Sequence, residues 1–223
     1  MGKAVVVFSG GLDSTTALYK AVSDGYEVYA VSFDYGQKHR KELDQAVRIA
    51  QGLGVSHEVV DITTITGLIS NSALTSSEKE VPEGHYAEDN MKVTVVPNRN
   101  MIMASIAIGY AVNIGASAIY LGVHSGDHFV YPDCRPEFVR LLSQIALTAN
   151  EGFIEPGFRV ITPFLNSSKA DIVRLGAQLQ VPYELTWSCY KGGAMHCGKC
   201  GTCVERKEAF ELAGLVDPTV YDR

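Results

Sequence analysis

Short apolar runs alternate with amphipathic stretches at the start of the chain, and this alternation limits the fold more than any other feature of the sequence. Residues 3–8, 26–33 and 55–62 are predicted to form strands. Residues 41–53 place their apolar side chains on one face of a helix, and a first helix runs to about Ser23. Such a βαβαβ start predicts an α/β fold with a doubly wound parallel sheet, where ligands bind at the carboxyl ends of the strands.

The length of 223 residues suits one sizeable domain and a small appendage. We expect residues 1–182 to form the α/β domain and residues 183–223, where Cys, Gly, Lys and His become frequent, to form the appendage. Residues 70–92 are polar without a clear period, so we expect a mobile surface loop, either a lid or an insertion without function. The net charge of −6 makes the chain a poor general binder of nucleic acid.

An uncharged stretch over residues 101–123 raises the question of a membrane span. Turn signals around Asn113 and Gly115 interrupt it, so we expect a buried helix, a turn and a buried strand over residues 118–123. The apolar run near the N-terminus is too short for a signal peptide. We therefore expect a cytoplasmic protein that makes no membrane contact.

A segment rich in glycine and hydroxyl groups lies between the first strand and the first helix. It consists of Phe8, Ser9, Gly10, Gly11, Leu12, Asp13, Ser14 and Thr15. Glycines let backbone N–H groups approach an anion, hydroxyls add donors, and a helix N-terminus adds positive potential. The segment has neither the lysine of a Walker loop nor the G-x-G-x-x-G pattern. It predicts a phosphate site, and the alternative is a tight turn capped by Asp13.

Two single residues at element ends are further candidates for binding. Lys169 stands at a predicted helix start, where Ser168 and Asp171 have the spacing of a capping box. It can hold an anion as a point charge, or it can be a solvated lysine of the first turn. Asp34 follows the second strand, where this fold places a ribose or an adenine, or it caps the next helix.

Four of the five cysteines gather near the C-terminus as Cys189, Cys197, Cys200 and Cys203. Four thiolates suit a tetrahedral Zn²⁺ with no vacant position, and a closed shell indicates a structural role. His196 is adjacent to Cys197 and is not expected to be a ligand. The alternatives are an iron–sulfur cluster, a redox-active thiol set and a nucleic-acid-binding zinc ribbon.

Between the glycine segment and the cysteines, residues 122–138 follow the buried strand. This stretch contains Asp127, Asp133 and Glu137 as acceptors, Arg135 as a cation, and Phe129, Tyr131 and Phe138 as rings that can stack on a base. Residues 96–100 add a second cation, Arg99, with amide groups beside it. The alternative for both stretches is a plain loop with helix caps.

The run S-G-G-L-D-S-T at the end of the first strand closely resembles the PP-loop of the ATP pyrophosphatases. The resemblance implies an adenine nucleotide alpha hydrolase-like, Rossmann-like fold and cleavage of ATP between its α and β phosphates. It implies ATP, with Mg²⁺, as a substrate. The implied nucleotide-binding residues are Phe8, Ser9, Gly10, Gly11, Leu12, Asp13, Ser14, Thr15, Thr16, Ala17 and Leu18, together with Asp34.

Over nearly its full length the chain resembles the 7-cyano-7-deazaguanine synthase family, which makes a deazapurine nitrile on the route to the tRNA nucleoside queuosine. The resemblance rests on residues 8–15, 34–37, 96–100, 131–138 and 186–190, on His39, and on the four clustered cysteines. It implies 7-carboxy-7-deazaguanine, ammonia and ATP as substrates, with no direct contact to nucleic acid. It also implies one structural Zn²⁺ per chain on the four cysteines, and we expect a homodimer.

Within this chemistry, the candidate residues receive specific roles. We expect Asp13 to bind Mg²⁺ or to fix the loop geometry, Ser9, Gly10 and Gly11 to hold phosphate, and Lys169 to hold pyrophosphate. Residue type alone assigns Arg135 to the substrate carboxylate and Asp133 to the guanine-like N–H edge.

Two other functional classes stay open from the residues themselves. One is a PP-loop enzyme that modifies tRNA, such as a sulfur transferase with Cys134 as its thiol. The other is a non-catalytic ATP-binding or zinc-ribbon interaction module.

Overall fold

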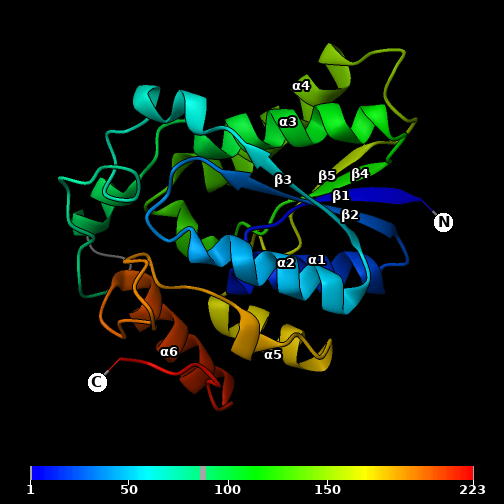
Figure 1. Ribbon diagram of the computed structural model, residues 1–223. Coiled ribbons are helices and arrows are strands. Elements are labelled where there is room, and N and C mark those ends of the chain that lie inside the picture. The colour runs from blue at the N-terminus through cyan, green and yellow to red at the C-terminus, as the bar shows by residue number, and fades with distance from the viewer. Residues whose placement is uncertain (1, 86–88, 223) are drawn as a thin grey trace.

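A five-stranded parallel sheet forms the centre of the computed structural model, which describes residues 2–85 and 89–222. The strand order is β3-β2-β1-β4-β5. The strands are β1 (Lys3–Val7), β2 (Glu27–Asp34), β3 (Ser56–Asp61), β4 (Ala118–Tyr120) and β5 (Arg159–Ile161). The predicted α/β fold with a doubly wound parallel sheet is confirmed (Figure 1).

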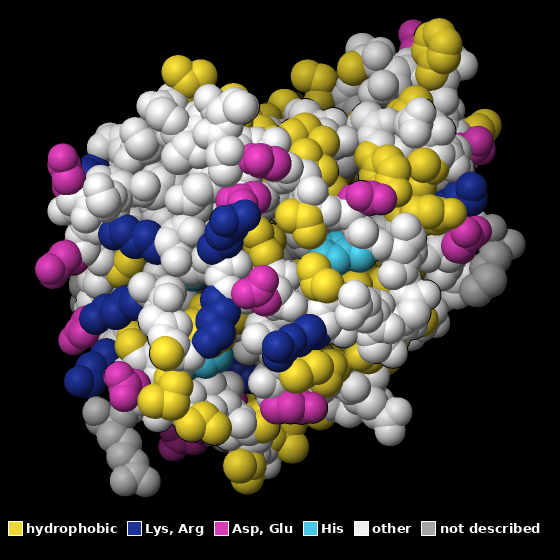
Figure 2. Space-filling view, in the orientation of Figure 1, with side chains coloured by type: hydrophobic (Ala, Val, Ile, Leu, Met, Phe, Trp, Pro, Cys, Tyr) yellow, Lys and Arg dark blue, Asp and Glu magenta, His cyan; other side chains and the backbone are white. Residues whose placement is uncertain are grey.

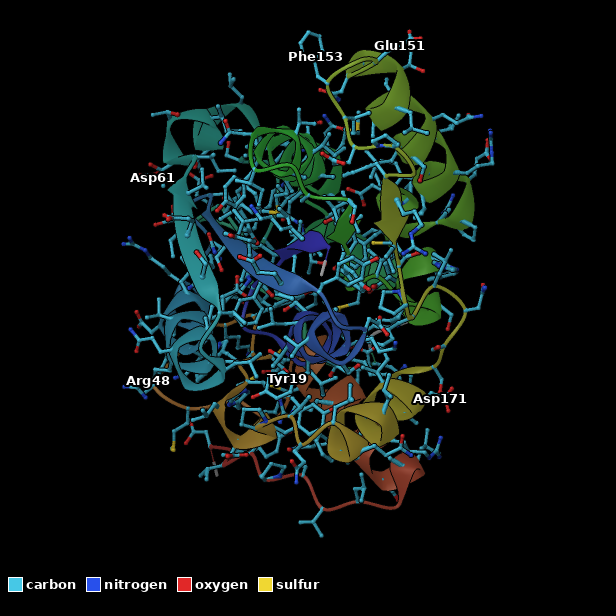
Figure 3. All side chains as sticks on the ribbon, turned by 90° about the vertical axis from the view of Figure 1, so that its right-hand side faces the viewer. Tyr19, Arg48, Asp61, Glu151, Phe153 and Asp171 are labelled. Atoms are coloured by element: carbon cyan, nitrogen blue, oxygen red, sulfur yellow. The ribbon has the colours of Figure 1, made fainter. Side chains whose placement is uncertain are left out.

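Helices cover both faces of this sheet. Helices α1 (Leu12–Ser23) and α2 (Lys41–Leu53) lie on one face, and α3 (Arg99–Asn113) and α4 (Pro136–Ala149) lie on the other. Figure 3 shows the two layers: Tyr19 and Asp171 lie on one side of the sheet, and Glu151 and Phe153, just after α4, on the other. Helices α5 (Lys169–Gln178) and α6 (Gly201–Ala213) pack against each other next to α1.

Short 3₁₀ helices complete the connections. They are η1 (Thr63–Leu68), η2 (Asp89–Thr94), η3 (Ser125–His128), η4 (Pro132–Cys134) and η5 (Tyr183–Leu185).

The central strand β1 is apolar at every position but its first because both of its faces are covered. Val5 packs in the cluster that contains Ala107 of α3, while Val6 packs with Leu18 of α1 and Ala46 of α2. These two valines and the three helix residues that they pack with are fully buried. The strand end is therefore held rigidly, and the loop that follows it starts from a fixed point.

The uncharged stretch over residues 101–123 is divided as the turn signals predict. It forms most of α3, a turn at Ile114 and Gly115, and then β4, which ends at Tyr120. Within the described parts of the chain, no helix has both the length and the apolar character that crossing a membrane requires.

The polar segment over residues 70–92 begins as packed structure. Ser72, Ala73 and Leu74 are fully buried, and the Ala73 N–H donates to the Val93 carbonyl over 2.8 Å. The Ser72 hydroxyl donates to the Thr94 carbonyl over 3.0 Å. The sequence suggests a loop because the two apolar residues, Ala73 and Leu74, are too few to show a period. Mobility of the segment stays a prediction, and residues 86–88 lie outside the described residues.

A buried arginine holds the residues after 182 together. Arg206 of α6 has no exposed surface, and its guanidinium donates to the Tyr183 carbonyl (2.9 Å) and the Thr186 hydroxyl (2.7 Å). It also pairs with Asp217 at 3.1 Å. The backbone N–H of Trp187 donates to the Gly10 carbonyl over 2.9 Å, so this region contacts the glycine segment directly. A domain boundary at residue 182 stays a prediction.

Candidate active site

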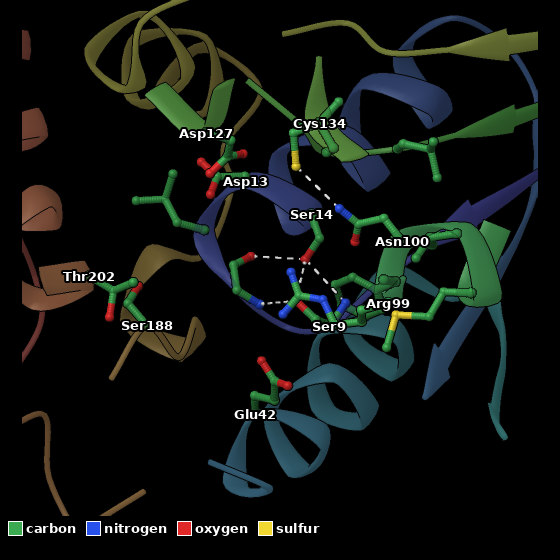
Figure 4. A pocket seen from close by; sticks show the side chains of 18 of the residues that line it. Ser9, Asp13, Ser14, Glu42, Arg99, Asn100, Asp127, Cys134, Ser188 and Thr202 are labelled. Carbon is green, nitrogen blue, oxygen red and sulfur yellow. Dashed lines mark hydrogen bonds between the residues drawn. The ribbon is translucent and has the colours of Figure 1, made fainter. Parts of the chain in front are cut away.

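A cavity opens at the carboxyl ends of β1, β2 and β4, where the fold places ligands (Figure 4). The N-terminal turns of α1, α2, α3 and α5 point toward it, and the residues that follow Tyr183 close it from below. Two groups of polar side chains face the cavity, one around Lys169 and one around Glu42.

Backbone geometry shapes the glycine segment. Gly10 has a φ of 82°, and a Cβ added there would lie 2.4 Å from the Glu42 carbonyl oxygen. Gly11 is the N-cap residue of α1, and no side chain caps it among the described residues. A glycine at this position leaves the space in front of the helix open. The first backbone N–H groups of α1 are available to an anion.

Hydroxyl groups fix the shape of this segment from within. The Thr15 hydroxyl donates to the Gly11 carbonyl (2.7 Å), and the Ser9 and Ser14 hydroxyls lie 3.1 Å apart. The Gly11 N–H donates to the Ser9 hydroxyl over 3.3 Å. Of the predicted nucleotide-binding residues, Phe8, Ser9, Gly11, Leu12, Asp13 and Ser14 line the cavity. Thr16, Ala17 and Leu18 are buried on the far side of α1 and support it from behind.

Lys169 is brought to the same end of the cavity and forms what we call the lysine cluster: Asp13, His124, Lys169 and Glu205. The ammonium nitrogen lies 2.9 Å from Asp13 Oδ2 and 2.7 Å from Glu205 Oε2. It also lies 3.4 Å from His124 Nε2. The prediction of a capping box at the start of α5 is confirmed, because Ser168 and Asp171 bind each other's backbone N–H groups.

Charge pairing favours the ionised forms of Lys169 and Asp13. Burial alone would lower the pKa of Lys169, but the carboxylates of Asp13 and Glu205 raise it above its ordinary value. Burial opposes ionisation of Asp13 too, yet Lys169 and His124 hold its pKa below the usual range. Asp13 Oδ1 is buried without a hydrogen-bond partner among the described residues. That oxygen suits a hard cation such as Mg²⁺.

The second group, which we call the Glu42 corner, consists of Gln37, His39 and Glu42. All three side chains are nearly fully buried, and Glu42 Oε1 accepts from Gln37 Nε2 at 3.2 Å and lies 3.4 Å from His39 Nε2. Burial raises the pKa of Glu42 to about 8. Burial also lowers the pKa of His39 to about 3, so the imidazole is neutral.

Several predicted residues lie away from the cavity. Arg135 is exposed and its Nε donates to the His128 carbonyl over 2.9 Å. Asp34 accepts from the Gly36 N–H (3.2 Å) and pairs with Arg40 (2.7 Å), so it stabilises the turn after β2. Asp133 accepts from the Asn100 N–H at 3.0 Å and caps α3. The placement supports none of the three predicted binding roles.

The arginine that lines the cavity is Arg99, at the first turn of α3. Its guanidinium carbon lies 5.8 Å from the centre of the Tyr131 ring. The sequence marks both Arg99 and Arg135 as cations near strand ends, but only packing decides which one turns inward. Glu42 and Glu205 carry no such signal, since each stands on a helix among ordinary charged residues.

The four predicted metal ligands come together as expected. One thiol sulfur from each of Cys189, Cys197, Cys200 and Cys203 lies within 4.8 Å of every other. The Cys200 and Lys199 N–H groups point to Cys197 Sγ, at 3.2 and 3.4 Å. His196 instead lies against Trp187, with ring centres 4.2 Å apart, and accepts from the Ser188 N–H. Four thiols at this spacing can hold a soft metal ion.

Comparison with known proteins identifies the family of the chain. A family model described as "Queuosine biosynthesis protein QueC" matches residues 3–214. The chain is 53% identical over 220 residues to a 7-cyano-7-deazaguanine synthase of Marinomonas sp. (strain MWYL1), covering 99% of this chain and 98% of that protein. A second such synthase, from Pseudoalteromonas atlantica (strain T6c / ATCC BAA-1087), is 53% identical and is covered to 99% in both chains.

A solved structure shares the fold at low sequence identity. The structure of NMN synthetase from Francisella tularensis matches with a TM-score of 0.54 and 15% identity, covering 96% of this chain and 78% of that chain. The glycine segment, the cysteine cluster and the full-length sequence match agree with one another, and the chain belongs to the QueC family of queuosine biosynthesis proteins.

Proposed function

We propose that the protein converts 7-carboxy-7-deazaguanine and ammonia into 7-cyano-7-deazaguanine, with ATP as the activating substrate. The observation that carries the proposal is the uncapped glycine segment at the start of α1 with Lys169 and Asp13 beside it. Its chemistry fits a phosphate chain next to a base-binding cavity. The printed name of relatives that are 53% identical across the full chain supports the choice of substrate.

The first half of the reaction makes an amide. A carboxylate oxygen of the substrate attacks the α-phosphorus of ATP, the bond to the bridging oxygen breaks, and pyrophosphate leaves. Ammonia then attacks the carbonyl carbon, AMP leaves with that carboxylate oxygen, and one proton is released. The N–H groups of the first turn of α1 orient the phosphates, while Lys169 neutralises the departing pyrophosphate. Mg²⁺ bound at Asp13 would shield the phosphate charge.

The second half removes the remaining oxygen. The amide oxygen attacks the α-phosphorus of a second ATP, pyrophosphate leaves again, and loss of the nitrogen protons with departure of AMP gives the nitrile. The same glycine segment serves both steps, because one anion site fixes one phosphorus toward the substrate.

Oxygen labelling tests this order of reaction steps. With both carboxylate oxygens present as ¹⁸O, we expect one label in the AMP of each activation. The 7-amido compound supplied directly should give nitrile without ammonia and with half the ATP. Label in inorganic phosphate, with ADP as the second product, would mean attack on the terminal phosphate and would refute the adenylylation step while leaving the substrate assignment intact.

We also propose that the four-cysteine cluster holds one structural Zn²⁺. Four thiolates fill its tetrahedral shell, so the ion would stabilise the region after residue 182 and leave no position for substrate. In Cys197→Ser, metal analysis should show the zinc lost and thermal unfolding should shift to lower temperature. Cys134→Ser is the matched control and should retain its zinc. Freshly purified protein with four reactive thiols and no metal would contradict the proposal.

Sulfur transfer to tRNA receives no support from the geometry. The Cys134 thiol is 3% exposed, and burial raises its pKa, so it is poorly suited to act as a thiolate nucleophile. On the face shown in Figure 2, basic side chains are interspersed with acidic ones, which disfavours this face as an RNA-binding surface. Full activity of Cys134→Ser on the deazapurine acid would exclude the sulfur-transfer function.

The homodimer expected for the chain stays a proposal with its own measurement. Light scattering coupled to gel filtration should give twice the chain mass of 24.2 kDa. A mass of one chain at the protein concentration used in assays would contradict it.

A further inference from the structure

The cavity is lined by a cation, Arg99, and a carboxyl group, Glu42, which interact electrostatically but form no ion pair. Arg99 lines the cavity and has no carboxylate within ion-pair distance among the described residues. Glu42 points into the cavity from α2, well apart from the Asp13 and Asp127 carboxylates in Figure 4. A ligand with an anionic group at one end and hydrogen-bond donors at the other would satisfy both.

The Glu42 corner is a rigid site. The Gln37 side chain is fixed by the backbone of its own turn. Its Oε1 accepts from the Tyr35 N–H (2.9 Å), and its Nε2 donates to the Phe33 carbonyl (3.1 Å). The same amide also donates to Glu42 Oε1, which leaves the carboxyl group little freedom. Both neighbours contact Oε1, and none of the described residues donates to Oε2.

The same corner contains a buried nitrogen without a partner among the described residues. His39 is 3% exposed, and its Nδ1 has no hydrogen-bond partner among the described residues. Tyr35, Phe33 and Tyr190 line the same part of the cavity and give it aromatic walls. A buried carboxyl group between aromatic walls, with an open oxygen, is complementary to a planar ring that has adjacent N–H donors.

The other carboxylates near the cavity are already engaged. Asp13 pairs with Lys169, Asp127 lies 3.6 Å from His124 Nε2, and Asp133 caps α3. Among the described carboxyl groups that line the cavity, Glu42 is the one apart from the proposed phosphate site. Two ligand N–H donors would compensate for its burial and favour its ionised form.

We propose that Glu42 binds the donor edge of the deazaguanine ring, its ring N–H and its 2-amino group, while Arg99 binds the carboxylate at the other end of the same molecule. The inference rests on the proposed function and adds the orientation of the acid. It makes Glu42 the residue that selects a 2-amino-pyrimidinone ring, because an analogue without that amine leaves a buried acceptor unpaired.

An analogue series tests the assignment. The substrate and its 2-desamino analogue are compared in wild type, in Glu42→Gln and in Asp44→Asn, a control that removes the same charge from an exposed position on α2. Wild type and Asp44→Asn should prefer the substrate about 10- to 100-fold in kcat/KM, the range expected for hydrogen bonds to a charged group. Glu42→Gln should show a preference below about threefold, with KM for ATP unchanged.

Each outcome decides the point. Unchanged discrimination in Glu42→Gln refutes the role of Glu42, and a raised KM for ATP with unchanged discrimination assigns the corner to the adenine base instead. Glu42→Asp keeps the charge and should retain part of the preference, which separates recognition from a folding defect. Calorimetric titration of the acid without ATP measures binding independently of turnover. Wild-type protein that neither binds nor converts the acid would refute the proposed function itself.

Discussion

The two groups of side chains that face the cavity differ in how many of their polar atoms have a hydrogen-bond partner within the protein. In the lysine cluster, Lys169 is within hydrogen-bond distance of both Asp13 and Glu205, and Asp13 Oδ1 is the one buried oxygen left without a partner among the described residues of the cluster. In the Glu42 corner, one carboxyl oxygen and one imidazole nitrogen have no donor or acceptor partner there. The first is a prepared charge arrangement, whereas the second is incomplete until a ligand arrives.

The difference has a physical reason in the chemistry that we propose for each end. Phosphate binding needs fixed positive potential, which a helix N-terminus and a paired lysine supply at no reorganisation cost during reaction. Selecting one base needs unsatisfied polar atoms, because specificity comes from the penalty that the wrong ligand leaves behind. Substitutions at the two ends should therefore fail in different ways.

The largest effect is expected at the junction of the two ends, Gly10. In Gly10→Ala the new Cβ would meet the Glu42 carbonyl at 2.4 Å, in a backbone conformation with a φ of 82°. We expect the variant to be destabilised by about 2–5 kcal/mol and to lose turnover, as strain and overpacking add. Gly52→Ala in α2, where a Cβ meets nothing within 4 Å, should be neutral or stabilising. Denaturant unfolding and initial rates measure both, and an active Gly10→Ala would mean that the loop relaxes.

Next in size is the loss of the lysine. Lys169→Met leaves the carboxylates of Asp13 and Glu205 near each other without a cation. We expect KM for ATP to rise by about 10- to 100-fold, the range for a lost charge-assisted hydrogen bond. Binding of the deazapurine acid should change little, because the Glu42 corner is separate. Equal losses for both ligands would show that the two ends do not act independently.

How far the sequence predicts the site follows the same division. The glycine segment and the cysteine cluster consist of residues that are contiguous or closely spaced in the sequence, so their chemistry can be recognised before the fold is known. The Glu42 corner and the Glu205 contact are assembled across elements: Glu42 looks like an ordinary charge near a helix start, and Glu205 like one of several charges beside the cysteines.

Residue type alone did not distinguish two candidate arginines. Arg135 and Arg99 follow similar sequence signals, but the Arg135 side chain folds back onto the His128 carbonyl while Arg99 turns inward from α3. Likewise, residue type suggests a ligand contact for Asp133, whereas its carboxylate accepts from the Asn100 N–H in the structure. The positions of the first strands and helices along the chain were predictable because the hydrophobic period indicates them. Side-chain direction at loop ends is set by tertiary packing, which a single sequence does not show.

A smaller effect is expected where the C-terminal region reaches the phosphate site. Glu205 stands on α6, two positions after Cys203, and its carboxylate holds Lys169 at 2.7 Å. Glu205→Gln should raise KM for ATP by about two- to tenfold, the range for one hydrogen bond, with zinc content and KM for the acid unchanged. Glu208→Gln on the same helix, which pairs only with the exposed His85 among the described residues, is the control. A change in zinc content would make the effect structural rather than positional.

The smallest effect separates the two ends by their response to pH. Asp13 has a lowered pKa and Lys169 a raised one, so neither titrates near neutrality. Burial lowers the pKa of His39 to about 3, against about 6.5 for the unfolded chain. A depressed histidine pKa contributes stability that is fully present above pH 6.5 and is lost as the pH falls toward 3.

Between pH 7 and 5.5 the wild type should therefore lose about 1 kcal/mol of unfolding free energy that His39→Asn does not lose. Glu42, with its pKa raised to about 8, gains stability as the pH falls, and it does so in both proteins, so the difference between them isolates His39. Urea unfolding at the two pH values gives the difference directly. Parallel losses in wild type and variant would show that the imidazole is already protonated in the folded protein, and the Glu42 corner would then hold an ion pair instead of a site open to a ligand.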